Sequence, residues 1–147
     1  MKMPELKTGR FIPEDGLRIT VQVPETHVQR IVDAVLAVSA LKYGDYDRVT
    51  FQTSAGTQSF RSLGSGRNAA TEAAVEVPCV ELSFFLGRED AGAAQVLESV
   101  YASHPYEEPV IYVTPCLRTL HIRGMDEDNP NRFWNSAPED WVPDAHR

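Results

Sequence analysis

The sequence lacks the long apolar runs that membrane proteins and exported precursors carry. No stretch approaches the roughly 18 consecutive apolar residues needed to cross a bilayer. The N-terminal stretch MKMPELKTGRFIPEDG has no apolar core of the kind found in signal peptides. Neither membrane insertion nor export is therefore expected, and the sequence predicts a cytoplasmic protein.

Cysteine is scarce, with two residues in 147. Cys79 and Cys116 have no CxxC or HxxC spacing, and both fall inside strand-like apolar runs. This excludes a disulfide framework and a cysteine-based metal or redox centre. We expect two reduced thiols that behave as small buried apolar groups, as suits a reducing compartment.

Basic residues and catalytic motifs are also few. The chain has 14 Lys and Arg against 21 Asp and Glu, a net charge of -7, so it has no basic stripe for a nucleic-acid backbone. It contains no GxxxxGK[ST] phosphate loop and no GxSxG serine motif, and neither cysteine lies in a motif with a histidine. We therefore expect a protein that is not an enzyme and that binds neither nucleic acid nor membrane.

Apolar periodicity predicts an alternation of strands and helices. Residues 17–23 (LRITVQV) alternate strictly and predict a strand, and residues 24–41 carry apolar side chains at helical spacing. Two short strand-like pieces, 48–53 and 57–61, flank Ser54-Ala55-Gly56 and predict a hairpin. A polar, glycine-rich loop is expected at 63–71.

The second half of the pattern repeats the first. Residues 74–86 predict a long strand in which Pro78 marks a bulge or an edge segment. A helix follows, with Glu89 and Asp90 as its N-terminal charges, and residues 110–114 form a last strand. This order predicts an α+β, ferredoxin-like antiparallel sheet with two helices on one face and with the first strand between the third and the last.

The composition divides the chain into three parts. We expect a domain at 17–121, an N-terminal extension at 1–16 and an acidic, aromatic tail at 122–147. The prolines of the tail argue against a helix. Its aromatic side chains, Phe133, Trp134 and Trp141, predict that it lies across its own domain or a neighbouring subunit.

The segment from Ser103 to Pro109 concentrates functional groups between two prolines. His104, Tyr106, Glu107 and Glu108 could form a small-ligand site, and His104 with Glu107 could bind a divalent metal ion. The alternative is structural: His104 would bond to backbone at the end of a helix while the two glutamates are solvated or pair with arginines. The residues alone leave both interpretations open.

A second candidate site is the turn between Arg61 and Arg67. Gly64-Ser65-Gly66 could let backbone N–H groups approach an oxyanion, which the two guanidinium groups would also bind. A solvated connection would have the same composition.

The sequence from about Leu17 to Leu117 resembles the PII-like, CutA-like domain inserted in the GTP cyclohydrolase I type 2 homologue family, the Nif-three or YqfO-like proteins. The resemblance rests on Ala102-Ser103-His104-Pro105-Tyr106-Glu107-Glu108-Pro109. Further matching residues are Tyr43-Gly44, Tyr46-Asp47, Gly56-Thr57-Gln58-Ser59-Phe60-Arg61, Gly66 and Asn68.

The resemblance implies a stand-alone module without metallo-hydrolase chemistry, because the family's metal ligands lie in domains that flank this insert. The family's usual Asp after the motif is replaced here by Tyr112. PII and CutA proteins are trimers that bind small molecules or metal between subunits. The resemblance therefore predicts a homotrimer, or otherwise a dimer, that acts as a binding or regulatory module through a small ligand or a protein partner. The alternatives are a divalent-cation-binding protein of CutA type and a ligand-free structural interaction module.

Overall fold

The computed structural model describes residues 4–88 and 92–147 and divides into two compact units. One unit is Glu14–Arg118, and the other combines the described residues up to Pro13 with Thr119–Arg147. The larger unit begins and ends three residues before the domain expected at 17–121. The expected helix charges Glu89 and Asp90 lie outside the described residues.

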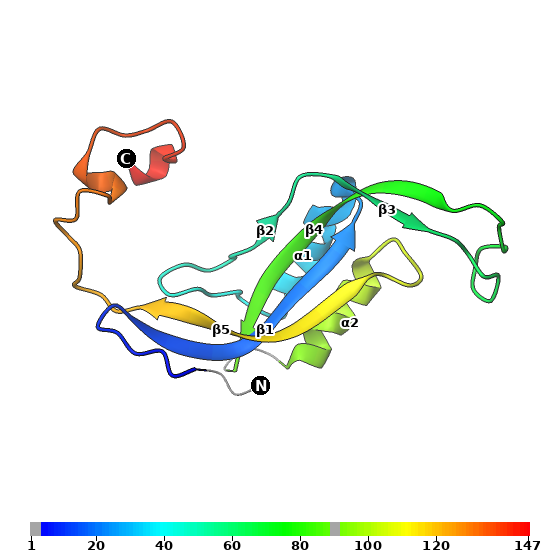
Figure 1. Cartoon of the computed structure of the whole chain (residues 1–147), viewed down its shortest axis with the longest axis horizontal. Helices are drawn as coiled ribbons and strands as arrows, with labels where there is room; N and C mark the ends of the chain where they lie inside the picture. The colour runs from blue at the N-terminus through cyan, green and yellow to red at the C-terminus, as the bar shows by residue number, and fades with distance from the viewer. Residues whose placement is uncertain (1–3, 89–91) are drawn as a thin grey trace. The chain divides into compact units, whose positions relative to one another are not determined.

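The described residues contain an antiparallel sheet of five strands. These are β1 (Phe11–Val23), β2 (Phe51–Gln52), β3 (Gly56–Phe60), β4 (Val75–Gly87) and β5 (Ile111–His121). The order is β2-β4-β1-β5, with β3 also paired to β4 (Figure 1). The strand order and the ferredoxin-like α+β class predicted from the sequence are confirmed.

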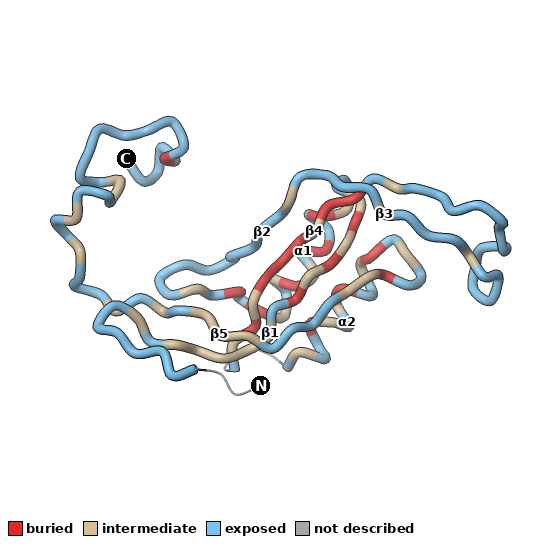
Figure 2. The backbone as a smooth tube through the Cα atoms, in the orientation of Figure 1, coloured by how far each residue is buried: buried red, intermediate tan, exposed pale blue. Residues whose placement is uncertain are grey.

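Both helices, α1 (Val28–Leu36) and α2 (Ala93–Ser103), pack on one face of the sheet and enclose the core (Figures 1 and 2). Alternate side chains of the two central strands face the helices, as the period of two requires. The core contains Ile19, Val21 and Val23 of β1, Val80, Leu82, Phe84 and Leu86 of β4, Val28, Ile31 and Val35 of α1, and Val96 and Val100 of α2. Among the described residues, the other face of the sheet carries no helix.

The predicted hairpin over 48–61 is wrong. β2 and β3 do not pair with each other, because both pair with β4, one after the other along the same edge. Phe51 lies opposite Ser83, and Gly56 lies opposite Cys79, so the connection contains one residue more than β4 does across the same interval. Ser54-Ala55-Gly56 therefore forms a bulge-like step within an edge and not a turn.

Three element boundaries also differ from the prediction. β1 begins at Phe11 and β5 continues to His121, so both strands are longer than their apolar centres. The first helix ends at Leu36 and not near Leu41. Leu41 still reaches the core, with 1 % of its surface exposed, because the chain turns there with a positive φ of 49°.

β4 extends past the end of β1 and forms a two-stranded ribbon with β3. β1 ends at Val23, opposite Val80, whereas the pairing of β3 with β4 continues to Phe60 opposite Val75. The backbone carbonyl of Glu81 accepts from Thr53, on the β2 side of β4. Backbone groups alternate between the two sides of a strand, so those of Pro78 face the opposite side, where β1 has already ended. The N–H that proline lacks therefore costs no hydrogen bond to a neighbouring strand. The ribbon and its loop are largely exposed (Figure 2).

The C-terminal residues contain two single 3-10 turns, η2 (Phe133–Asn135) and η3 (Asp144–His146), within the smaller unit. Phe133 of η2 contacts the rings of Trp134 and Trp141. None of the described helices is long and apolar enough to cross a membrane.

Candidate functional site

His104 lies where α2 gives way to the strand that follows. Its backbone N–H donates to the Val100 carbonyl at 2.9 Å, as in the last turn of a helix. Its own backbone is extended (φ -76°, ψ 139°), the conformation that the following Pro105 favours. The side chain is 8 % exposed and points back over the sheet.

Both ring nitrogens of His104 bond to backbone groups. Nε2 lies 2.8 Å from the carbonyl oxygen of Gln22 on β1, and Nδ1 accepts from the N–H of Tyr106 at 3.0 Å. A carbonyl can only accept, so Nε2 carries the proton, and an N–H can only donate, so Nδ1 does not. His104 is thus a neutral imidazole that joins α2, β1 and the following loop.

The surroundings of His104 favour this neutral form. Burial lowers the pKa of the imidazole, and the charges of His27 and Arg30 lower it further, while the Gln22 carbonyl opposes them. Burial is the largest of these effects, because removing an imidazolium from water without a counter-ion is unfavourable. The structural interpretation of His104 therefore agrees with its bonds.

Tyr106 packs beside His104 with its hydroxyl enclosed. The two ring centroids are 4.9 Å apart with a tilt of 56°. Burial raises the pKa of the Tyr106 phenol, and Cys79 adds to the effect. Within the described part of the chain, the buried Tyr106 hydroxyl has no hydrogen-bond partner. Such a group is uncommon in folded proteins and suggests that a polar atom from outside the chain completes it.

Glu107 connects the motif to the loop between β3 and β4. Its Oε1 accepts from the backbone N–H of Arg67 at 2.9 Å. A Cβ on Gly66 would lie 2.5 Å from that oxygen, so only glycine lets the carboxylate approach so closely. The backbone donor expected to cradle an anion is therefore occupied by an internal carboxylate.

The remaining predicted residues have separate environments. Arg61 donates to the Glu72 carbonyl at 3.2 Å within its own loop, and the side chain of Glu108 is exposed. A metal ion on His104 and Glu107 would have to displace backbone bonds from both. Within residues 4–88 and 92–147, no three His, Cys, Asp or Glu side chains lie close enough together to hold an ion. Metal binding by His104 and Glu107 stays a prediction.

Sequence reasoning missed a charged clamp around Arg118. Its guanidinium donates to Glu14 through Nε (3.0 Å) and Nη2 (2.8 Å), and Nη1 donates to the Lys42 carbonyl at 2.8 Å. The same group lies 4.8 Å from the Tyr43 ring centroid and 4.3 Å from that of Phe85. These residues are far apart in sequence, so no local pattern could have connected them.

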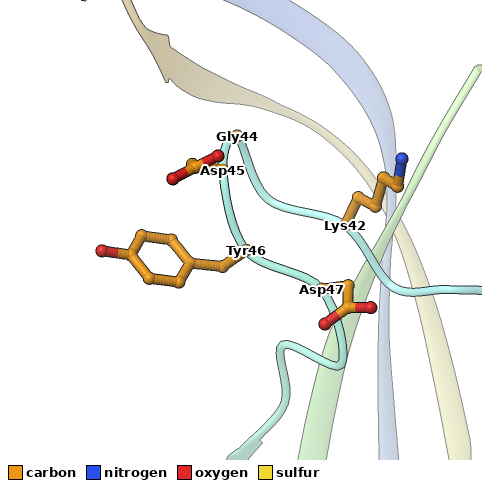
Figure 3. Close-up of a pocket in the computed structure, with 5 residues that line it drawn as sticks. All are labelled: Lys42, Gly44, Asp45, Tyr46 and Asp47. Carbon is orange, nitrogen blue, oxygen red and sulfur yellow. The ribbon is translucent and has the colours of Figure 1, made fainter. Parts of the chain in front are cut away.

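The clamp holds the loop that contains Tyr43-Gly44 and Tyr46-Asp47 of the family resemblance. A hollow of about 360 Å³ opens there, lined by Lys42, Gly44, Asp45, Tyr46 and Asp47. Figure 3 shows that Tyr46 and Asp45 point to one side while Lys42 and Asp47 point elsewhere. Side chains that diverge in this way do not form a ligand site.

Both cysteines are free thiols, as predicted. Cys79 is buried, and burial raises the pKa of its thiol, with the Glu81 carboxylate adding to the effect. Cys116 is half-buried, so the expectation that both thiols are buried is correct for Cys79 and wrong for Cys116.

Comparison with known proteins gives structural neighbours alone. No protein-family model and no curated protein matches the sequence. A Bacillus cereus protein related to NIF3 has a TM-score of 0.56 and 24 % identity; the match covers 74 % of this chain and 27 % of that one. CutA1 from the psychrotrophic bacterium Shewanella sp. SIB1 has a TM-score of 0.51 and 19 % identity over 71 % of this chain and 82 % of its own.

CutA from Synechococcus elongatus PCC7942 also gives a TM-score of 0.51, with 20 % identity over 76 % of this chain and 87 % of its own. Because these identities are below 25 %, the likeness concerns the fold. The chain therefore has a CutA-like fold, which it shares with a segment that makes up about a quarter of the NIF3-related protein.

Proposed function

We propose that the protein is a homo-oligomeric PII/CutA-like binding or regulatory module. It assembles as a trimer, or otherwise a dimer, in the cytoplasm and acts through a small ligand or a protein partner. The role is binding and not catalysis, because the imidazole of the signature motif has both ring nitrogens in backbone bonds.

The ribbon of β3 and β4 is the observation that carries this proposal. From Val75 to Cys79, β4 pairs with β3 and no longer with β1, so this part is a two-stranded hairpin. An isolated hairpin of this kind is marginally stable in water. It nevertheless exposes large apolar groups: Phe60 is 42 % exposed and Val75 is 45 % exposed. A second copy that covers the ribbon would remove this surface from water.

The helix-free face of the sheet continues this apolar surface. Phe60 pairs with Val75, and Phe51 pairs with Ser83, so all four side chains lie on the face opposite the core residues Val80 and Leu82. Phe51 is 66 % exposed. A monomer would leave Phe51, Phe60 and Val75 in water, whereas packing between subunits would bury them.

The motif and the loop between β3 and β4 supply the proposed ligand site. It contains His104, Tyr106, Glu107 and Glu108 with Arg61 and Arg67. The buried Tyr106 hydroxyl supports a polar group of a ligand or partner at this position, because a hydrogen bond there would relieve a desolvation cost.

A ligand-free interaction module is the second candidate, and the bonds of His104 favour it. An imidazole that ties α2 to β1 serves folding without any ligand. Under this candidate, assembly occurs and no small molecule alters it.

Light scattering of the purified chain tests assembly. We expect an oligomer at micromolar concentration, and Phe60→Asp should shift it toward monomer. Tyr101→Asp is the matched control, because Tyr101 is 54 % exposed on α2, away from the helix-free face. A monomeric wild-type protein would refute the proposal.

A thermal-shift panel of divalent metals and nucleotides tests the ligand, since a ligand that binds only the folded state raises the melting temperature. The response should weaken in Tyr106→Phe, which removes only the hydroxyl. If no compound in the panel shifts the melting temperature while the oligomer persists, the ligand-free module is the correct description.

A further inference from the structure

Two exposed indole rings form a surface in the smaller unit, which we name the tryptophan surface: Trp134 and Trp141. Trp134 is 49 % exposed and Trp141 is 63 % exposed. Phe133 lies between them, with ring centroids 5.3 Å from Trp134 and 5.8 Å from Trp141, both edge to face. Exposed tryptophans held in this way are typical of binding surfaces.

The tryptophan surface is fixed by hydrogen bonds. The Trp134 indole N–H donates to the Glu127 carbonyl at 3.0 Å, and that of Trp141 donates to Glu139 Oε2 at 2.5 Å. Next to it, Val142 is 2 % exposed, and Arg147 donates to the Val142 carbonyl. The N–H groups of both indoles are therefore satisfied inside the unit, and the exposed part of each ring remains open to a partner.

The surroundings of the tryptophan surface are acidic. Between residues 124 and 146 the chain carries six carboxylates and one arginine. Asp126 is neutralised by Arg10 and Arg132. The other five are exposed: Glu127, Asp128, Glu139, Asp140 and Asp144. Of these, Asp144 lies 3.6 Å from Arg147.

We infer that the tryptophan surface binds an arginine-containing basic segment of another protein. A guanidinium group stacks on the face of an indole, and the exposed carboxylates offer the opposite charge around it. The same carboxylates would repel nucleic acid and anionic lipid. The tryptophan surface of a second copy would bring the same exposed carboxylates against these ones, so it does not supply the opposite charge. This inference does not depend on the proposed oligomer or its ligand.

The chain contains two tryptophans, and both lie in this surface, so intrinsic fluorescence reports on it directly. The probe is a fluorescein-labelled peptide of alternating arginine and glycine, titrated against the full chain at low ionic strength. We expect a change in tryptophan emission and a rise in peptide anisotropy, both weakened by added salt. A matched peptide with glutamate in place of arginine should produce neither.

Variants distinguish binding of the peptide at the tryptophan surface from non-specific electrostatic attraction to an acidic protein. Trp141→Ala should weaken binding of the arginine peptide about tenfold, and Trp141→Phe should weaken it less. Neutralising three acids near the tryptophan surface should also weaken binding about tenfold. This is the combined effect expected from losing three exposed charge pairs with the arginine peptide. The local set is Asp128→Asn, Asp140→Asn and Asp144→Asn. The control set, with the same change in net charge in the larger unit, is Glu25→Gln, Glu72→Gln and Glu98→Gln.

The control set should change the affinity less than twofold. The inference is overturned if the arginine peptide leaves tryptophan emission unchanged, if Trp141→Ala binds as tightly as the wild type, or if both acid sets weaken binding equally. Circular dichroism of each variant checks that it is folded, and Trp141→Phe gives a second reading of the aromatic contribution should Trp141→Ala unfold.

Discussion

Replacing His104 with alanine should destabilise the protein substantially. The substitution leaves two backbone groups without partners, the Gln22 carbonyl and the Tyr106 N–H. Each buried unpaired group costs about 1–3 kcal/mol. Tyr106 is half-buried, so in the variant water can partly replace the hydrogen bond that its backbone N–H loses. We therefore expect a loss of about 2–4 kcal/mol in the free energy of unfolding.

Urea unfolding followed by circular dichroism at fixed protein concentration measures this loss. His104→Gln places an amide donor near the Nε2 position and should keep the Gln22 bond. His104→Asn places an oxygen near the Nδ1 position and should keep the Tyr106 bond. Each should therefore recover part of the stability lost in His104→Ala. His27→Ala is the control, because its ring bonds the exposed Thr26 hydroxyl, and we expect a change under about 0.5 kcal/mol.

The lowered pKa of His104 makes its contribution depend on pH. The unfolded chain binds a proton at this imidazole near the ordinary value of about 6.5, whereas the folded protein resists protonation until lower pH. The contribution is therefore complete above about pH 6.5 and is lost as the pH falls below it, by at most about 1.4 kcal/mol per pH unit. The difference in stability between wild type and His104→Gln should shrink over that interval.

The opposite pattern would refute this reasoning. If His104→Ala changed the free energy of unfolding by less than about 0.5 kcal/mol and abolished the thermal response to a metal or anion, His104 would be a ligand-binding residue. A stability difference that grew as the pH fell below 6.5 would contradict the neutral imidazole.

Three further predictions concern other contacts. Gly66→Ala should lower the melting temperature slightly, because the exposed Glu107 side chain can move away only by releasing its bond to Arg67. Glu107→Ala should remove this effect, so a double-mutant cycle in thermal unfolding should show coupling of about 1 kcal/mol or less. Arg118→Lys should lower the free energy of unfolding in urea by about 1–3 kcal/mol. A lysine ammonium group cannot donate to Glu14 through two nitrogens and also stack between Tyr43 and Phe85. An unchanged urea midpoint would refute this role of Arg118. In native protein, Cys79 should react with a thiol reagent more slowly than Cys116, because burial raises its pKa and shields it, and equal rates before unfolding would contradict its position.

Much of the fold could be predicted because its strands and helices carry regular apolar patterns. The alternation in 17–23 and the helical spacing of Val28, Ile31 and Val35 identify surfaces that must be buried together. The ends of elements depend on partners instead. β1 starts at Phe11, although Pro13 and Gly16 are poor strand residues, because pairing with neighbouring strands extends it.

The hairpin error has a similar physical origin. Ser54-Ala55-Gly56 has the composition of a turn, and composition cannot tell a reversal of direction from a one-residue step beside a longer partner. Only β4, which pairs with both pieces, decides between them. The bonds of Glu107 to Arg67 and of His104 to Gln22 likewise join segments that no local pattern connects.

The unequal lengths of β1 and β4 give one strand two levels of local stability. From Val80 to Gly87, β4 pairs with the central strand β1, and at Leu82 and Ser83 it also pairs with β2, so its amide hydrogens should exchange with solvent only through large-scale unfolding. From Val75 to Cys79 it has β3 alone among the described strands, so those amides should exchange through separate opening of the ribbon. Hydrogen exchange should therefore change abruptly next to Pro78, and partners that cover the ribbon should slow exchange on one side of that boundary while leaving the other side unchanged.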